Sequence, residues 1–528
     1  MSTVELNVTA GSETPEVPRG ESRVKGLTHK AYLNAFASLL DAVVKGGVLA
    51  VVTPLVVSGL GSSLFGVWQI LGRLITYMHA ADGRPTQALK WVIANRQVVD
   101  DDEAKRRHVG SAMGVWFLFL PVLIAMSALL VWISPYMTKV PAEMFVTVRV
   151  TCGLLVANFL LIQLVSLPES VLRGMNLGYK RMGWQAALNV VGGVLTVGAL
   201  YIGSGLIGLA AGQVILAALT GVLFLVVVKK YVPWFGLARP VMSEVRSFLK
   251  LSVWWFAWAT VSKFLMASDI LILGMVASSS DVATYALTSF AGTTLLSLVT
   301  IVLGAVTPGL GSVIGQKQYE RAAEIRIEMM TVSWLILAAV GSTILLWNRS
   351  FIFLWVGPQH YSGFWANLLM VLMIVQLIYI RNDSYVIDLT LQLREKVLMA
   401  VVAAVISIGL SALLIPRMGI AGLCLGMILG RLALTISYPF VINKQLGRSS
   451  RPELTGALRP ATVMTLMFVV SAYLGSVLLA DNWFIWGICS GISFALALGV
   501  GLIAGLNRKS RSAIVKRLTM LRTLLFSP

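Results

Sequence analysis

The sequence predicts an all-α polytopic membrane protein with fourteen transmembrane helices, and three observations support this prediction. The chain of 528 residues is 57% hydrophobic and 12% charged, which is about half the charged fraction of an ordinary soluble domain. It contains fourteen apolar runs long enough to cross the ~30 Å hydrocarbon core of a bilayer. Its 42 lysines and arginines, against 23 acidic residues, are distributed unevenly between the two sides of these runs.

Charged or polar connections separate the apolar runs from one another. The first seven predicted spans are 33–58, 64–81, 110–133, 145–167, 184–202, 206–228 and 251–276. The other seven are 282–306, 330–347, 364–380, 397–415, 420–442, 461–479 and 483–506. An even number of spans places both ends of the chain on the same side of the membrane.

The positions of the basic residues predict which side this is. If the N-terminus is cytoplasmic, 34 of the 42 lie on the cytoplasmic segments, three on the opposite connections and five inside spans. Cytoplasmic loops carry the excess of Lys and Arg in membrane proteins, so we expect both termini of this multi-pass protein in the cytoplasm. The net charge of +19 is then explained by topology, and no nucleic-acid partner is expected.

The two ends of the chain and the cysteines carry weaker signals. Residues 1–30 are polar and rich in small residues, which predicts a disordered cytoplasmic leader. The basic tail 507–528 fits an amphipathic interfacial helix or an ordinary solvated tail equally well. Cys152, Cys424 and Cys489 fall inside spans with no metal-type spacing, so we expect neither disulfides nor a metal, and no cofactor is expected.

An internal repeat appears at an offset of 214 residues. Residues 205–212 read GLIGLAAG and residues 419–426 read GIAGLCLG, and at the same offset Glu169-Ser170 matches Asp383-Ser384. Glycines at this spacing also allow close helix packing in any membrane bundle, which is the simpler explanation of the glycines alone. Because the first match opens the sixth span and the second opens the twelfth, the repeat is parallel.

The repeat predicts the domain organisation. Two six-helix bundles are expected, joined by a cytoplasmic linker and followed by two extra C-terminal helices. The predicted boundaries are 31–232 for the N-terminal bundle, 233–250 for the linker, 251–446 for the C-terminal bundle and 460–506 for helices 13 and 14.

Motif searches favour a protein that is not an enzyme. The sequence has no P-loop, no G-x-S-x-G and no H-E-x-x-H motif. The acidic run 100–103 resembles a metal-binding carboxylate cluster, but three basic residues follow it closely, which is more typical of a solvated charge run. The outer connections are too short to hold a catalytic domain.

Ionisable residues inside spans are the best candidates for function, because each costs at least ~2.5 kcal/mol near the bilayer centre. Arg149 lies near the end of its span and can snorkel. Four cations lie near mid-span, two in each bundle: Lys45, Arg73, Lys263 and Arg431. Together they favour binding of an anion such as a pyrophosphate in a poorly screened cavity. Structural ion pairing is the alternative for each of them.

Four acids complete the candidate site. Asp41 and Asp269 lie close in sequence to Lys45 and Lys263 and can neutralise part of their charge. Glu169 and Asp383 lie just beyond the inner ends of spans 4 and 10. They are candidates for coupling protons, or for pairing with gating arginines such as Arg173 and Arg394, and solvated helix caps are the alternative.

These features resemble a known family. The two parallel bundles, the GLIGLAAG and GIAGLCLG openings and the GSSLFGVW segment at 61–68 are similar to the polysaccharide flippase branch of the multidrug/oligosaccharidyl-lipid/polysaccharide (MOP) exporter superfamily, over residues 30–445. The resemblance implies a V-shaped cavity between two lobes and alternating access. Members of that branch move undecaprenyl-pyrophosphate-linked oligosaccharides from the cytoplasmic to the periplasmic leaflet.

The resemblance also narrows the expected substrate. Fourteen spans occur in the related lipid II flippases, whose last two helices help to form a lipid groove, but the arginine-rich first span of those proteins is not found. A repeat unit of exopolysaccharide, O-antigen or capsule is therefore expected, with membrane lipids, a polymerase and other assembly proteins as partners. A drug or metabolite antiporter of the same superfamily is the alternative, and a membrane polymerase or glycosyltransferase is a less favoured one.

Overall fold

The computed structural model describes residues 20–81, 85–95, 101–175, 177–242, 245–246, 261–264, 268–390, 393–446, 454–507 and 511–512. Predictions for residues 1–19 and 513–528, and for most of 247–267, lie outside this part of the chain. Within it, helix α1 begins at Gly20, so residues 20–30 are helical and not the disordered segment that their polarity suggested. Their Glu, Arg and Lys residues are good helix formers and lead directly into the first span.

Helices account for the regular structure of the described residues. The first group comprises α1 (Gly20–Ala81), α2 (Pro85–Asn95), α3 (Asp102–Thr138), α4 (Phe145–Gly174), α5 (Tyr179–Tyr201) and α6 (Gly205–Tyr231). The second comprises α8 (Ser279–Thr288), α9 (Phe290–Gly315), α10 (Tyr319–Trp355), α11 (Phe364–Thr390) and α12 (Leu393–Gln445). Helices α13 (Leu454–Val477) and α14 (Trp483–Val500) follow, and a π-helical turn (Gly501–Gly505) ends the last one.

The helices confirm the predicted class of an all-α polytopic membrane protein. Ten helices in the described residues are long and apolar enough to cross a membrane, or eleven if the bent pair formed by α8 and the start of α9 counts as one span. Helices α1 and α12 each join two predicted spans across a kink, at Gly61 and Gly419 respectively. The predicted span 251–276 is described only in part.

Three glycines at the turns between spans adopt backbone conformations that other residues rarely reach. Gly205 has φ +54° and Gly419 has φ +56°, and Gly61 has φ +77°. A positive φ is accessible to glycine because it has no Cβ. Gly205 and Gly419 are the first residues of the two repeated motifs, so the matching sequences have matching backbone geometry.

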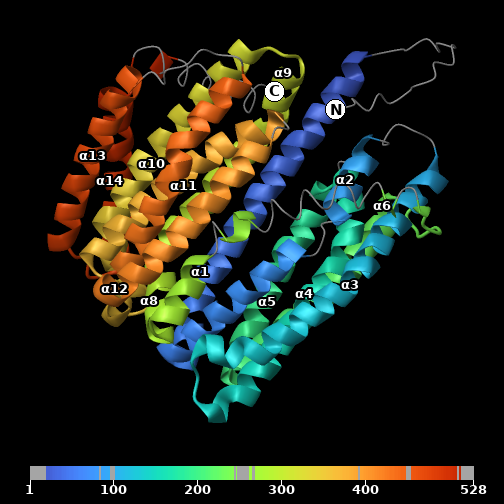
Figure 1. Ribbon diagram of the computed structural model, residues 1–528, viewed down its shortest axis with the longest axis horizontal. Helices are drawn as coiled ribbons and strands as arrows, with labels where there is room; N and C mark the ends of the chain where they lie inside the picture. Colours follow the sequence, from blue (N-terminus) through green and yellow to red (C-terminus); the bar gives the residue numbers. More distant parts are fainter. Residues whose placement is uncertain are drawn as a thin grey trace.

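The helices form two groups that lie side by side (Figure 1). Within the first group α1 packs on α5 and α4 packs on α6, while in the second α11 packs on both α9 and α12. Helices α13 and α14 both pack on α10, at the outside of the second group. We refer to these groups as the first and second bundles, and to the end with the predicted cytoplasmic loops as the inner end.

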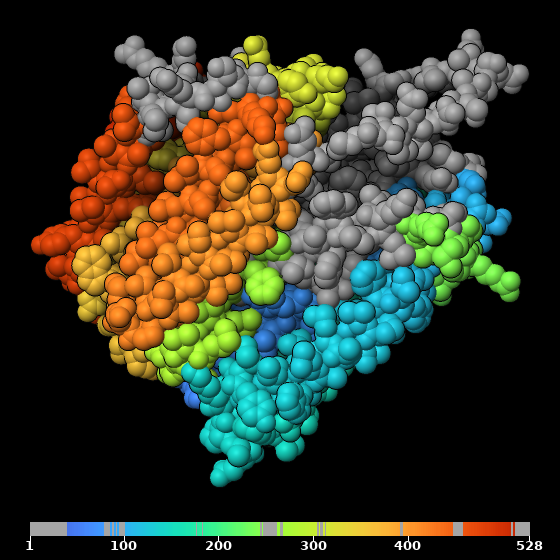
Figure 2. All heavy atoms as spheres, viewed as in Figure 1, coloured from blue at the N-terminus to red at the C-terminus, as the bar shows by residue number. Residues whose placement is uncertain are grey.

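The two bundles meet at the outer end. Ser279 Oγ of α8 donates a hydrogen bond to the Thr138 carbonyl oxygen at 3.0 Å, and Lys139 Nζ donates to the Ala277 carbonyl oxygen at 3.2 Å. A Cβ on Gly66 of α1 would lie 1.7 Å from the Ser279 carbonyl oxygen, so α1 and α8 are in backbone contact there. In the space-filling view α8 (lime green) lies against α1 (blue) and the outer end of α3 (teal) (Figure 2).

An apolar core extends from this junction into both bundles. It contains buried residues of α1, α3 and α4 together with residues of α8, α11 and α12. Among the described helices, the contacts between the bundles run chiefly from α1 to α8, with fewer to α9. The bundles are therefore joined near the outer end, which is the arrangement that a rocking motion about that end requires.

Candidate functional site

Charged and phenolic side chains from both bundles gather where α1 faces the second bundle. We call Arg73, Tyr77, Asp269, Tyr285 and Arg431 the Asp269 cluster. Arg73 and Tyr77 lie one turn apart on α1, Tyr285 is on α8 and Arg431 on α12. Asp269 lies in the short described segment that precedes α8. Three of the predicted site residues, Arg73, Asp269 and Arg431, are thus brought together.

Asp269 is the centre of the cluster. Its side chain is 8% exposed, and the Tyr285 hydroxyl donates a hydrogen bond to its Oδ2 at 2.7 Å. Its other oxygen, Oδ1, is buried without a hydrogen-bond partner among the described residues. A buried carboxylate costs several kcal/mol unless a positive charge compensates it, so the cations near Asp269 matter for the stability of the site.

The two arginines supply this positive charge. Arg431 is 2% exposed and interacts electrostatically with Asp269, Tyr285 and Cys424. Arg73 is half-buried and lies within electrostatic range of the hydroxyl groups of Tyr77 and Tyr285, as Asp269 also does. One arginine of the cluster therefore comes from each bundle.

The positions of the two arginines along their helices are equivalent. Arg73 lies twelve residues after Gly61, and Arg431 lies twelve residues after Gly419. Since both glycines mark the outer turns of their helices, each arginine lies about 18 Å along its helix from the outer turn. This distance places both near the middle of a ~30 Å hydrocarbon core, as the sequence predicts.

The other two predicted cations are placed differently. Lys263 is half-buried, and the ring of the adjacent Phe264 packs edge-on against Tyr77 with 5.1 Å between ring centroids. Lys263 therefore lies beside the Asp269 cluster. Lys45 is exposed on α1, and the Asp41 carboxylate one turn away accepts a hydrogen bond from Asn189 Nδ2 of α5 at 2.8 Å. Asp41 therefore has an amide partner within the first bundle, and its neutralisation of Lys45 stays a prediction.

At the inner end of the first bundle, Glu169 forms an ion-pair cluster. Its Oε1 accepts from Arg173 Nη2 at 2.6 Å and from Arg181 Nη2 at 2.7 Å. Arg173 is one turn further along α4, whereas Arg181 is on α5. Lys90 of α2 lies within electrostatic range of both groups. Burial lowers the pKa of Lys90, the charge of Arg173 lowers it further, and the charge of Glu169 raises it. Glu169 thus pairs with Arg173 as the sequence suggests.

At the inner end of the second bundle, the repeat-equivalent Asp383 pairs with a residue that the sequence does not indicate. Its Oδ1 accepts from both Nε and Nη2 of Arg326 on α10, at 2.7 Å each. Arg394, the expected partner, is exposed. The physical reason is that α10 packs directly on α11, which brings Arg326 to Asp383 across 57 residues of chain. Asp383 itself is buried.

Sequence reasoning missed Tyr77, Tyr285 and Arg326. Tyrosines in spans are common, and a search for charged residues alone passes over them. The position of Tyr77 one turn after Arg73 was the available signal, because residues four apart share one face of a helix. Nothing local indicates that Tyr285 bonds Asp269, since this depends on the packing of α8.

The fold is shared by solved transporters of the MOP superfamily. An inward-facing multidrug resistance MATE transporter matches with a TM-score of 0.65 at 14% identity, covering 78% of this chain and all of the other. The lipid II flippase MurJ in an inward closed conformation matches with a TM-score of 0.64 at 12% identity, covering 93% of this chain and all of the other. A MOP transporter from Pyrococcus furiosus matches with a TM-score of 0.57 at 14% identity, covering 80% of this chain and 95% of the other.

No protein-family model and no curated protein matches the sequence. The structural matches nevertheless define the class: the chain is a multi-pass membrane protein with the fold of MOP superfamily transporters and flippases. They confirm the fold expected from the sequence, whereas membership of the superfamily and of its polysaccharide branch stays a prediction.

Proposed function

We propose that this protein is a flippase for undecaprenyl-pyrophosphate-linked oligosaccharides, which it moves from the cytoplasmic to the periplasmic leaflet of the bacterial inner membrane. The observation that carries the proposal is the Asp269 cluster, in which each bundle contributes an arginine at the same depth to one buried carboxylate. Two cations on opposing bundles suit a pyrophosphate, whose charges are spread over two phosphoryl groups. Both termini are cytoplasmic in this proposal.

The cluster suggests how substrate binding is coupled to motion. In the absence of substrate, Asp269 is the counter-ion of Arg73 and Arg431. A pyrophosphate that enters from the inner end becomes a second counter-ion of the two arginines, with Lys263 beside it. The net charge at the interface of the two bundles changes as a result. Because the bundles are joined near the outer end, rocking about this junction exposes the site alternately to the two leaflets. The chain performs no covalent chemistry in this scheme.

The choice of a lipid-linked substrate rests on further observations. The match to the lipid II flippase covers 93% of this chain, against 78% for the multidrug transporter, and helices α13 and α14 lie beyond the two bundles that the sequence repeat defines. We assign the glycan to exopolysaccharide, O-antigen or capsule synthesis from the resemblance described above. A polysaccharide polymerase and other assembly proteins are the partners that this role implies.

Charge removal at the cluster tests the proposal. Arg73→Gln combined with Lys263→Gln removes two cations that are only half-buried, which limits the effect on folding. We expect at least a tenfold loss of translocation of undecaprenyl-pyrophosphate-linked oligosaccharide in proteoliposomes, and loss of surface polysaccharide in cells with normal protein levels. Arg149→Gln is the matched control, because Arg149 is a half-buried cation that stacks on Phe145, away from the cluster. Unchanged translocation by the double variant would refute the assigned site.

A drug antiporter is the second candidate, and one observation favours it. The unpartnered Oδ1 of Asp269 could attract a cationic drug or a coupling ion. This role predicts that overexpression raises resistance to organic cations and that Asp269→Asn abolishes the effect, while deletion leaves surface polysaccharide intact. Loss of polysaccharide without any change in resistance would exclude it.

A further inference from the structure

The outer junction between the bundles is built from the ends of helices. On one side α3 ends at Thr138, and Lys139 is its C-cap. On the other side the helical segment 268–276 ends just before Ala277, and α8 begins at Ser279. The last carbonyl groups of a helix have no partner within that helix. Each bundle therefore brings carbonyl groups that need an outside partner to the same place.

These carbonyl groups are paired reciprocally. Lys139 Nζ of the first bundle donates to the Ala277 carbonyl oxygen at 3.2 Å, and Ser279 Oγ of the second bundle donates to the Thr138 carbonyl oxygen at 3.0 Å. A cation is stabilising at a helix C-terminus because of the helix dipole, so the ammonium group suits its position. Each bundle thus caps a helix end of the other. We call these two contacts the outer latch.

Lys139 has a backbone conformation that lysine rarely adopts. Its φ is +51° and its ψ is +38°, in the left-handed region. A side chain with a Cβ is disfavoured there, and glycine is the usual residue at such helix ends. Helix α10, the third span of the second bundle as α3 is of the first, is followed by Gly357 with φ +98°. A strained lysine at such a position indicates that its side chain has a function.

The location of the Lys139 charge is also unusual. Lys and Arg are concentrated on the cytoplasmic side of membrane proteins, and the predicted outer connections contain three of them: Lys139, Arg349 and Arg417. Arg349 Nη1 of α10 donates to the Ser476 carbonyl oxygen of α13 at 2.7 Å, so its contact stays on one side of the junction. The Lys139 contact, in contrast, crosses from one bundle to the other.

The outer latch is accessible to water. Lys139 is exposed and Ser279 is half-buried, so water can replace each hydrogen bond when it breaks. The net contribution of such a bond corresponds to about twofold to tenfold in an equilibrium constant. Two of these bonds are strong enough to favour a closed outer end and weak enough to break during a transport cycle.

We propose that Lys139 and Ser279 hold the outer ends of the two bundles closed, and that both contacts of the outer latch break each time the outer end opens. The inference rests on the rocking motion of the proposed function, because the Asp269 cluster cannot face the outer leaflet while these helix ends stay joined. It does not depend on the identity of the substrate.

A distance across the outer end tests the proposal in the full-length protein in nanodiscs. Spin labels are attached through p-acetylphenylalanine at the exposed positions Glu143 and Gln359, one on each bundle, which leaves the native cysteines unchanged. Lys139→Met removes the ammonium group, and Ser279→Ala removes the hydroxyl group. Double electron–electron resonance measures the ratio of open to closed outer ends. We expect this ratio to rise about threefold in each single variant and about tenfold in the double variant.

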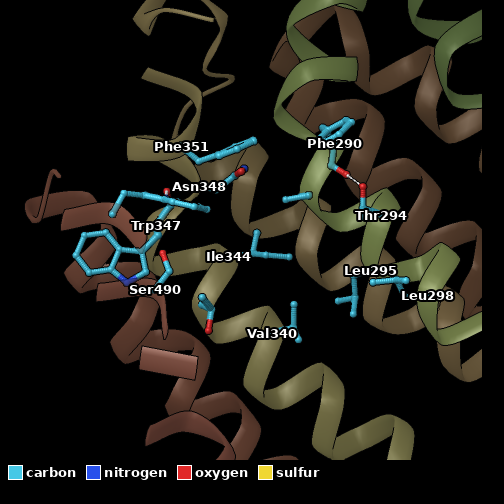
Figure 3. A pocket seen from close by; sticks show the side chains of 13 residues that line it. Phe290, Thr294, Leu295, Leu298, Val340, Ile344, Trp347, Asn348, Phe351 and Ser490 are labelled. Carbon is cyan, nitrogen blue, oxygen red and sulfur yellow. Dashed lines mark hydrogen bonds between the residues drawn. The ribbon is translucent and has the colours of Figure 1, made fainter. Parts of the chain in front are cut away.

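Two matched variants remove the same kinds of group within one bundle. Arg349→Met removes an outer cation of α10. The nearby Asn348 and Phe351 line a cavity of about 330 Å³ between α9, α10 and α14 (Figure 3), so this variant reports on looser packing in the second bundle. Ser204→Ala removes a hydroxyl group that donates to the Ala199 carbonyl oxygen at 2.7 Å in the first bundle. Neither variant should change the distance between the labels.

The outcomes decide on the latch separately from the transported substrate. An unchanged distance distribution in the double variant would overturn the proposal, and so would equal opening in the control variants, which indicates general loosening of the outer end. If the double variant fails to fold, Lys139→Met at its exposed position decides alone. If the latch variants open but the wild-type protein does not translocate undecaprenyl-pyrophosphate-linked oligosaccharide, the latch is supported and the proposed function is refuted.

Discussion

The inner ends of the two bundles carry equivalent acids in different surroundings. Glu169 and Asp383 occupy the same position in the sequence repeat, and each forms an ion pair with arginine. The Glu169 side chain is 21% exposed and pairs with Arg173 and Arg181, both within twelve residues of it. The Asp383 side chain is 6% exposed and pairs with Arg326, which is 57 residues earlier in the chain.

The two repeat-equivalent acids therefore both pair with arginine, but the arginines come from different parts of each bundle. In the first bundle a local pairing suffices, because the next turn of α4 and the start of α5 supply the arginines. In the second bundle, where Lys396 is also fully buried and paired with Asp388 at 2.5 Å, the packing of α10 on α11 supplies the charge. We therefore expect the second bundle to depend more strongly on its acid.

The largest effect is expected from Asp383→Ala. The substitution leaves the Arg326 guanidinium partly buried without its counter-charge, and the loss of one partner of a buried ion pair costs about 3 kcal/mol or more. The loss of stability is measured by thermal or denaturant unfolding of the protein in detergent. Asp383→Ala combined with Arg326→Leu should be more stable than Asp383→Ala alone, because no uncompensated charge remains. A double variant as unstable as the single one would contradict this explanation.

A smaller effect is expected from Glu169→Gln. The amide oxygen still accepts a hydrogen bond from one arginine, so the expected loss is about 1.5 kcal/mol, the value of one hydrogen bond to a charged group. Glu324→Gln is the control, because Glu324 pairs with Arg321 at the exposed start of α10, where a pair contributes about 0.5 kcal/mol or less. In the same unfolding assay, the loss of stability should be larger for the Asp383 variant than for the Glu169 variant, and larger for the Glu169 variant than for the Glu324 variant. A larger loss at Glu169 than at Asp383 would contradict the expected difference between the two bundles.

The smallest effect is a pH dependence specific to the first bundle. Burial lowers the pKa of Lys90 below its ordinary value of 10.5, so between the lowered value and 10.5 the unfolded chain binds more protons than the folded chain. The free energy of unfolding therefore rises with pH in this window. In the Lys90→Met variant, the rise of Tm with pH from about pH 8 upward should be smaller, by a few tenths of a degree to a few degrees. Identical pH profiles of the two proteins would argue against this burial effect.

Much of the architecture was predictable because it depends on local sequence. Apolar runs indicate where helices cross a bilayer, and the repeated motifs 205–212 and 419–426 each begin with a glycine of similar positive φ. The residues of the candidate site were partly predictable for the same reason, since charges inside spans are costly and therefore few. Arg73, Asp269 and Arg431 were found in this way, whereas Tyr77, Tyr285 and Arg326 were not.

Local sequence is enough to predict an all-α membrane protein, the approximate positions of its spans, the repeat and the small set of charges inside spans. Which of these charges meet depends on the tertiary structure. Hydropathy is a property of each segment alone, but a cluster of charges depends on the rotation and depth of helices that can lie hundreds of residues apart in the chain, as those of Arg73 and Arg431 do. The packing of α1 against the second bundle sets the rotation and depth of the helices that form the Asp269 cluster. The packing of α10 on α11 sets them for the pair of Asp383 and Arg326.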